Sequence, residues 1–494
     1  MLVELAFLLL VAVIGRLLMG AAGMPDVDPS GVVVGTAVYG ATVALLLVVG
    51  TPPLPLVAMG ISLAVALLLA SGGGSWSARL ALSSVRPDRR TITSVLLVIV
   101  TGAVFHPLRL VRDATDAGPH LRYAALLHDG SLMIGDVGFK RGATFAAIEA
   151  IGVLAGDVAV MGVLPAFGMA ALLSVYGIVR SLAPAAPSGK ILGLIAVAVI
   201  ATNARFITNL VLIGPHLVVA FWLLLLMAVL TASAARRGRF GEPARWLTIA
   251  ALTIAIAAAR GEGAILVVLA AAPFLVPDRD RAARLGDVRA VAVGMLLWLV
   301  PYHTDRFAML PDSNGAATIA VAVLFAALCI RAVARLLARI PAVGIALFGA
   351  WGLLLAMAVV EPAGVIRRLI STAANVALDV GGWGVGLLLM IVIAGAVRVV
   401  TRSPLPLRAG LLLGAFVPVH ILIAIFGAEG LNIGEGSSLN RMLFHAYPVL
   451  VVATVMAVLR MHREEERDEV AARSREQRSR RPSPAGRAFG EEDF

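Results

Sequence analysis

Long apolar runs dominate the pattern of hydrophobic and polar positions along this chain. Stretches of roughly twenty apolar residues recur from the first residues to about position 460, separated by short segments rich in Arg, Gly and Pro. Each run is long enough to cross a hydrocarbon core about 30 Å thick, so we predict an all-α polytopic membrane protein with about fifteen transmembrane helices. The spans are expected near 2–19, 31–50, 54–71, 92–108, 158–180, 191–207, 213–234, 246–259, 262–277, 289–302, 315–330, 341–360, 381–398, 408–427 and 443–460.

The composition supports this class. Hydrophobic residues make up 60% of the 494 residues and charged residues only 14%, whereas soluble domains are about a quarter charged. The first run has neither a basic start nor a cleavage site before a polar domain, so we expect a retained span rather than a signal peptide. The only cysteine, Cys329, lies inside an apolar run, which excludes a disulfide framework and a cysteine metal cluster.

The basic residues predict orientation rather than nucleic-acid binding. The formal net charge is +11, but the arginines gather in alternate short loops, which in membrane proteins face the cytoplasm. We therefore expect no nucleic-acid partner. Lysine occurs only at Lys140 and Lys190, and this bias toward arginine indicates a high-GC bacterial genome and a bacterial plasma membrane. The loops expected in the cytoplasm are 79–90, 236–239, 279–284, 331–339 and 398–408.

This layout divides the chain into three parts. We expect residues 1–75 to form an N-terminal three-helix membrane extension and residues 92–460 to form the main transmembrane domain. The tail 461–494 is rich in Arg, Glu, Ser and Pro, so we expect it to remain disordered at the cytoplasmic face, where its arginines would contact anionic membrane lipid.

With the tail inside, the longest polar loop, 109–157, is expected outside the membrane. Its last part, 143–157, has apolar residues at helical spacing but also carries Glu149 and Asp157. We therefore predict an interfacial helix lying on the membrane surface rather than another crossing. The other outer segments are expected at 303–314, 361–380 and 428–442, with tight turns near 203–215 and 260–262.

The first outer loop concentrates ionisable residues. If the stretch after Pro119 is helical, Asp116 and His120 share one face and point into a common cavity. A carboxylate there could act as a general base on a sugar hydroxyl. The alternative is a solvated loop whose acids cap a helix beginning near Pro119. The ionisable residues of this loop are Asp113, Asp116, His120, His128 and Asp129.

Several arginines stand at the expected outer ends of spans. A guanidinium there is costly to bury and finds an anionic partner, and its fork suits a phosphate. The alternative is pairing with nearby acids such as Glu262 or Asp305. We expect at least one of these arginines to bind phosphate. They are Arg205, Arg260, Arg306, Arg367, Arg368 and Arg441.

Other motifs are absent or isolated. There is no HExxH, CxxC, Walker loop, GxGxxG after a strand or GxSxG, which removes support for zinc proteases, nucleotide-driven pumps and serine hydrolases. We expect no cofactor, and no two acids form the tight pair that a divalent metal prefers. His216 and His420 each stand alone in an apolar run, which favours a packing role for both.

The order of five segments resembles the GT-C superfamily of polytopic glycosyltransferases over residues 92–460. These enzymes in general use polyprenyl-phosphate-linked sugars at the outer face. By this resemblance the catalytic acid falls on Asp116, with Asp113 as the alternative, and His120 takes the place of the loop histidine. Arg260 and Arg441 fall near the lipid phosphate. The segments are DAGPHLRYAALLHDG, VYGIVRSL, IGPHLVVAFWLLLL, AIAAARGEGAILVVLAAAPFLV and NRMLFHAYPVLVVATVMAVL.

The match departs from the family in three ways. No Asp-Glu or Asp-x-Asp pair stands in the loop, three extra spans precede it, and no extracytoplasmic C-terminal domain follows. We still expect an inverting glycosyltransferase that moves a sugar from a polyprenyl-phosphate donor to a glycan, lipid or protein acceptor in the cell envelope. His128 and the outer arginines would bind substrate. The alternatives are a transporter or flippase of a lipid-linked or anionic substrate, a glycan polymerase or ligase, and a non-catalytic membrane scaffold.

Overall fold

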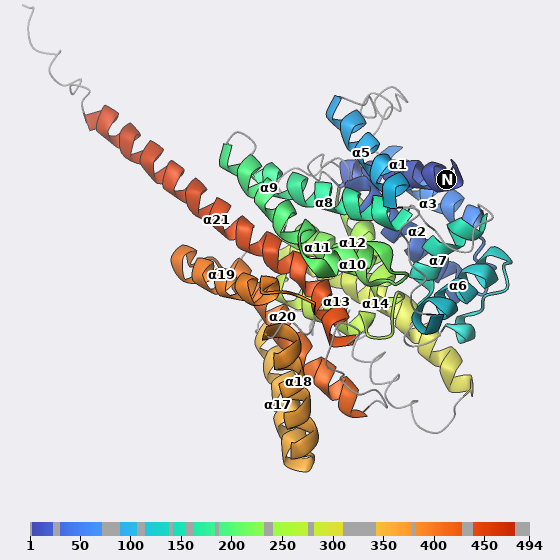
Figure 1. Ribbon diagram of the computed structural model, residues 1–494. Coiled ribbons are helices and arrows are strands. Elements are labelled where there is room, and N and C mark those ends of the chain that lie inside the picture. Colours follow the sequence, from blue (N-terminus) through green and yellow to red (C-terminus); the bar gives the residue numbers. More distant parts are fainter. Residues whose placement is uncertain are drawn as a thin grey trace, which may run out of the picture.

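The computed structural model describes most of the chain, and within the described residues there is no β-strand (Figure 1). These residues are 2–22, 30–71, 89–105, 114–137, 142–154, 163–182, 187–231, 241–274, 281–309, 342–377, 382–426 and 438–479. The helices of the first half are α1 (Leu2–Ala21), α2 (Ser30–Val48), α3 (Pro55–Ser71), α5 (Arg89–Phe105), α6 (Ala114–His128), the 3-10 turn η2 (Ile134–Asp136), α7 (Ala143–Leu154), α8 (Val163–Leu182), α9 (Pro187–Ala201), α10 (Ala204–Val211) and α11 (His216–Thr231). Those of the second half are α12 (Gly241–Ala257), α13 (Gly263–Phe274), α14 (Arg281–Met309), α17 (Ala342–Val360), α18 (Pro362–Ala377), α19 (Gly386–Thr401), α20 (Pro404–Phe426) and α21 (Ser438–Ser479).

The helices are those of a multi-pass membrane protein. Among the described residues, six helices are long and apolar enough to cross a membrane: α1, α2, α8, α14, α20 and α21. A seventh span results if α9 and α10, which are bent by 65° at a short break, count as one. Several shorter apolar helices lie between them. Fifteen spans therefore remain a prediction, and the span expected at 315–330, with Cys329, lies outside the described residues.

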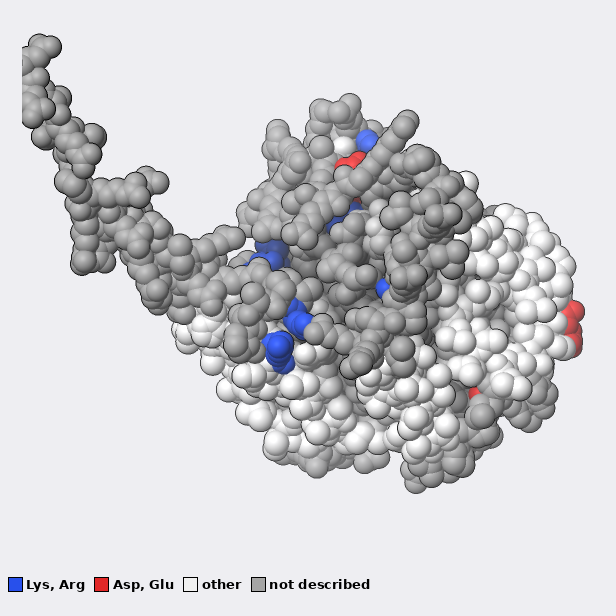
Figure 2. Space-filling view, turned by 90° about the horizontal axis from the view of Figure 1, so that it is seen from above, with Lys and Arg blue, Asp and Glu red and all other residues white. Residues whose placement is uncertain are grey.

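Exposed side chains in this chain are apolar to an extent that suits lipid. Val359 and Val360 at the end of α17 are 84% and 77% exposed, and Val399 in α19 is 77% exposed. Among the residues coloured in Figure 2, broad white areas carry no charge and charged side chains stand at only a few places. Large contiguous apolar patches are rare on monomeric soluble proteins, whereas in a membrane exposed apolar side chains contact lipid at no cost in free energy.

The first two helices cross at very close range. A Cβ atom added at Gly35 of α2 would lie 1.8 Å from the carbonyl oxygen of Val11, and one added at Gly15 of α1 would lie 2.0 Å from that of Gly31. Small residues at a helix crossing allow such backbone contact, which is a common source of association in membranes. Backbone proximity thus acts together with side-chain packing, since the ring of Phe7 in α1 meets that of Tyr39 in α2 edge-on at 5.2 Å.

The N-terminal segment is built into the rest of the bundle. Helix α2 packs against α7, α8, α11, α12 and α14. The Tyr39 hydroxyl donates to the carbonyl of Ala147 at 3.0 Å, and the Trp222 indole donates to the carbonyl of Val33 at 3.2 Å. Residues 1–75, expected as an extension, therefore supply part of the central packing.

Helix α7 occupies the segment expected to lie on the membrane surface. Every side chain from Ala143 through Gly152 is buried, including Glu149. Thr144 donates from its hydroxyl to the carbonyl of Ala255 in α12 at 2.9 Å. Small residues on several faces allow close packing on several sides, so α7 lies inside the protein, and the structure does not confirm an interfacial helix here.

Two helices occupy segments that we expected to be a turn or a loop. They are α10 in the turn near 203–215 and α18 in loop 361–380, whereas α6 lies in loop 109–157, where a helix was considered from near Pro119. Each contains charged or amide residues, which break the continuous apolar runs from which the spans were predicted. Amphipathic helices pack one face against the protein and leave the other polar, so a search for apolar runs passes over them.

The tail also differs from the expectation. Helix α21 continues to Ser479 instead of ending near position 460, and its C-terminal part projects away from the other helices in Figure 1. Glu, Arg, Ala and Gln, which are strong helix formers, dominate this stretch, and α21 already provides the nucleus from which a helix extends. Residues 480–494 lie outside the described part.

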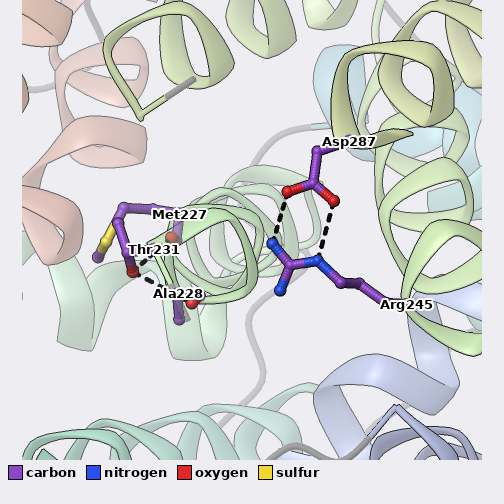
Figure 3. Close-up of polar contacts among 5 residues, drawn as sticks. All are labelled: Met227, Ala228, Thr231, Arg245 and Asp287. Atoms are coloured by element: carbon purple, nitrogen blue, oxygen red, sulfur yellow. Dashed lines mark hydrogen bonds and ion pairs between the residues drawn. The ribbon is translucent and has the colours of Figure 1, made fainter. Parts of the chain in front are cut away.

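A buried ion pair joins α12 to α14. Arg245 donates from Nε and Nη2 to the two carboxylate oxygens of Asp287 at 2.9 and 2.6 Å, as Figure 3 shows. Both side chains are almost fully buried. In the same view the Thr231 hydroxyl at the end of α11 donates to backbone carbonyls of its own helix. Two parallel hydrogen bonds offset the desolvation of both charges.

We predict that Arg245→Met lowers the free energy of unfolding by about 3–5 kcal/mol, because it leaves the buried carboxylate of Asp287 without its partner. The double variant Arg245→Met/Asp287→Leu should recover most of this loss, since no charge is then buried. Unfolding in mixed micelles at increasing SDS fraction measures both. Equal losses in the single and double variants would show that the pair stabilises the protein by packing alone.

Candidate functional site

Four ionisable side chains from distant parts of the chain meet in one hydrogen-bonded group. They are Glu262, Arg260, His216 and His445, which we call the tetrad. Arg260 and Glu262 stand in the turn between α12 and α13, His216 begins α11, and His445 lies near the start of α21. The starts of α11, α13 and α21 and the end of α12 therefore meet at one end of the bundle, which the distribution of arginines predicts to face outward.

The guanidinium of Arg260 is held on two sides. Its Nε and Nη2 donate to Oε1 of Glu262 at 3.2 and 2.7 Å, and its Nη1 lies 3.1 Å from Nε2 of His216. The side chains of Arg260 and Glu262 are only 12% and 10% exposed. The acid that we weighed as the alternative partner of Arg260 is thus its partner in the structure, and His216 is an additional one.

The hydrogen bonds assign the protons of both histidines. An arginine side chain only donates, so Nε2 of His216 must accept and carries no proton. Its proton is then on Nδ1, which donates to Nε2 of His445 at 3.1 Å. The two rings lie nearly parallel, with 5.2 Å between their centroids. Nε2 of His445 accepts, so a neutral His445 carries its own proton on Nδ1.

The tetrad has two buried ends without a partner. Neither Oε2 of Glu262 nor Nδ1 of His445 has a hydrogen-bond partner within the described residues. His445 is fully buried and Glu262 is 8% exposed. Buried polar atoms in native proteins almost always have a partner, and an exception indicates an unseen water, an ion or a ligand. The group therefore offers one donor and one acceptor.

Two of the residues expected from the sequence lie near the tetrad. His120 of α6 and Arg441 of α21 are both close enough to His216 for their charges to act on its ring. His120 is buried and its ring meets that of Phe145 edge-on at 4.9 Å. Loop helix α6 and the start of α21 thus reach the same region.

A third histidine joins this region from α20. His420 is buried and lies within electrostatic reach of both Arg260 and Glu262. We expected His216 and His420 to be isolated packing residues, and for His216 that interpretation was wrong, because it bonds to Arg260 and His445. A membrane span tolerates ionisable residues mainly where they pair or serve a function. That principle could have drawn attention to His216 and His420, and it would also have included His445.

A polar network fixes the start of α21, which carries Arg441 and His445. The amide of Asn440 donates to Oδ1 of Asn375 in α18 at 2.9 Å and accepts from the indole of Trp383 at the same distance. All three residues are buried. The register of α21 is therefore set by side-chain hydrogen bonds next to the site, and not by apolar contacts alone.

A small cleft opens beside the tetrad. Arg260 and Gly261 form part of its wall, together with Gly142 before α7 and the aromatic residues Trp298 and Tyr302 of α14. The space is about the size of one water molecule and lies beside the Arg260 turn. The segment before α7 is tied to the same turn, because the Gly142 amide donates to the carbonyl of Ala259 at 2.9 Å.

The expected catalytic residues share helix α6 where the structure describes them. The helix begins at Ala114, so Pro119 lies within it rather than at its start. Asp116 and His120 are four residues apart within this helix. The side chain of Asp116 is not among those described, and Asp113, the alternative acid, lies outside the described residues.

The other predicted substrate-binding residues are dispersed. His128 ends α6 and bonds through Nδ1 to the exposed Asp129 at 2.9 Å. Arg205 is buried at the start of α10, where its backbone amide donates to the side chain of Asn203. Arg306 lies in the last turns of α14, and its side chain is not among those described. The structure places neither His128 nor Arg205 in the tetrad.

The described residues contain no group of three or more His, Cys, Asp or Glu side chains arranged to hold a metal ion. In comparisons with protein-family models, curated protein sequences and solved structures, nothing matched this chain. The arrangement is therefore interpreted from its own chemistry. A fixed cation next to a cleft, a buried donor and nearby histidines can bind an anionic oxygen and stabilise charge that develops on it.

We predict that Gly142→Ala lowers the free energy of unfolding by about 1–3 kcal/mol, because the structure must shift to admit the new methyl group. Its Cβ would lie 1.8 Å from the carbonyl oxygen of Ala258. Gly20→Ala is the matched control, since no atom lies within 4 Å of its Cβ. That control should stabilise α1 slightly. Equal melting temperatures for both variants would contradict the close contact at the Arg260 turn.

Proposed function

We propose that this protein is a membrane glycosyltransferase that moves a sugar from a polyprenyl-phosphate donor to an acceptor at the outer face of a bacterial plasma membrane. The acceptor is a glycan, lipid or protein of the cell envelope. The observation that carries the proposal is the meeting of chain segments at one end of the bundle, in the tetrad and its neighbours. Those segments are the ones whose order resembles the GT-C enzymes.

Four of the five resembling segments supply residues to this region. His120 comes from the loop segment, His216 from the segment IGPH, Arg260 from ARGEG, and Arg441 and His445 from NRMLFHAYP. The other four lie within electrostatic reach of His216, although more than 300 residues separate His120 from His445. Any two apolar helices have similar compositions, so a match between them is weak evidence. A similar composition does not explain why ionisable residues from distant segments meet. The meeting of these residues therefore supports a functional meaning for the order of the resembling segments.

In the proposed reaction, an acceptor hydroxyl attacks the anomeric carbon of the donor sugar. The bond from that carbon to the phosphate oxygen breaks, and its electron pair leaves with the polyprenyl phosphate. Asp116 takes the proton of the hydroxyl, and Arg260 stabilises the charge on the departing phosphate, with Arg441 close by. A fixed guanidinium needs no reorganisation during the reaction, which makes it effective in a site of low dielectric constant.

A transporter or flippase for a lipid-linked anionic substrate is the second candidate. The break between α9 and α10, with its bend of 65°, favours it. Interrupted helices near the middle of a membrane often form the binding sites of transporters. Asn203 and Arg205 lie at this break, and both are buried. In a transporter, Arg205, Arg260 and Arg441 would line the path of the substrate, and no covalent bond would be broken.

We predict that Arg260→Gln lowers sugar release from a radiolabelled polyprenyl-phosphate sugar by about 10²–10³-fold, because it removes a preorganised charge partner. Arg122→Gln is the matched control, since Arg122 is an exposed arginine of α6, and it should keep wild-type activity. The assay uses purified protein in detergent. Equal activity of the Arg260 variant and its control would remove the guanidinium from the mechanism.

We further predict that Asp116→Asn lowers the same activity by about 10²–10⁴-fold, the range expected for loss of a general base. Asp136→Asn serves as its control, because Asp136 is exposed in the same outer segment. Full activity of Asp116→Asn would exclude this base. Movement of labelled lipid across proteoliposomes without sugar release, in wild-type protein, would favour the flippase.

A further inference from the structure

The hydrogen bonds of the tetrad all run outward from Arg260, toward Glu262 on one side and toward His445 on the other. Arg260 donates to both of its neighbours, His216 passes a donor on to His445, and His445 ends the series with an N–H. A guanidinium keeps its protons at any physiological pH, so no proton can travel from His445 through Arg260 to Glu262. The series therefore acts as a fixed arrangement of donors rather than as a proton wire.

The two ends of this arrangement suit opposite groups. Nδ1 of His445 is a buried donor, whereas Oε2 of Glu262 is a buried acceptor on a carboxylate. An anionic oxygen is repelled by the carboxylate and attracted by the N–H, so it binds at the His445 end. Arg260 is close enough to His445 for its charge to act there as well. Both features favour an oxyanion over a neutral ligand.

We propose that His445 is a ligand-binding residue whose Nδ1–H donates to a phosphate oxygen, with His216 holding it in the correct tautomer. The inference rests on the proposed function for the source of that phosphate, the headgroup of a polyprenyl phosphate. The shared chemistry is a phosphate oxyanion, and free phosphate is the other source. A buried donor left without an acceptor is costly, whereas a bond to a charged oxygen makes the same atom favourable.

Two substitutions of the same residue separate the donor from the rest of the ring. In His445→Gln the amide oxygen can take the place of Nε2 and accept from His216, but the Nδ1–H is lost. In His445→Asn the amide nitrogen can take the place of Nδ1 and donate, but the acceptor for His216 is lost. If His445 only filled space, the two variants would not differ in their affinity for the charged lipid relative to the uncharged one.

The test measures binding of polyprenyl phosphate and of the uncharged polyprenol to the full-length protein in nanodiscs. His445→Gln should weaken phosphate binding about tenfold to a hundredfold, the range for one hydrogen bond to a charged group. His445→Asn should lose less, and neither variant should change polyprenol binding. Wild-type phosphate affinity in His445→Gln, or equal losses for both lipids, would overturn the assignment.

A second measurement separates this inference from the proposed function. Nitrogen-15 NMR of histidine-labelled protein should show single protons on Nδ1 of His216 and His445, and the His445 signal should shift with polyprenyl phosphate. A shift of the His445 signal with inorganic phosphate but not with polyprenyl phosphate would support His445 as an oxyanion site and contradict the lipid-linked donor. Binding of polyprenyl phosphate without a shift of the His445 signal would overturn the role of His445 but not the proposed function. If neither polyprenyl phosphate nor inorganic phosphate binds, both the role of His445 and the proposed function are overturned.

Discussion

The outer end of the bundle depends on how the guanidinium of Arg260 is held. Glu262 neutralises it from within the same turn, and His216 accepts from its other edge. A charge buried this deeply would be destabilising without such partners. Because arginine can only donate, its position also decides which nitrogen of His216 carries a proton, and through it the state of His445. One ion pair thus sets the chemistry of side chains on three elements.

The rest of the fold keeps these elements in place. Glycine contacts bring α1 and α2 together, and α2 in turn supports α7 and α11. The Gly142 amide ties the segment before α7 to the end of α12, where the Arg260 turn begins. Asn440 fixes α21 through Asn375 and Trp383. Several side-chain hydrogen bonds near the site join helices that are distant in sequence.

The apolar runs predicted most of the long helices, because a bilayer imposes a length and a composition that are visible in the sequence. They did not predict the amphipathic helices α6, α10 and α18, nor that α7 is buried, since apolar residues suit a protein interior as well as a membrane surface. His120, Arg260 and Arg441 were singled out as ionisable residues near spans. The pairing of His216 with His445 spans 229 residues, and no local pattern encodes such a contact.

An experimental structure of the protein with bound polyprenyl phosphate tests the central claim most directly. The account predicts phosphate density beside Arg260, with one oxygen at hydrogen-bond distance, about 3 Å, from Nδ1 of His445. Headgroup density at another place, with Arg260 still closed between Glu262 and His216 and no group at His445, would contradict it.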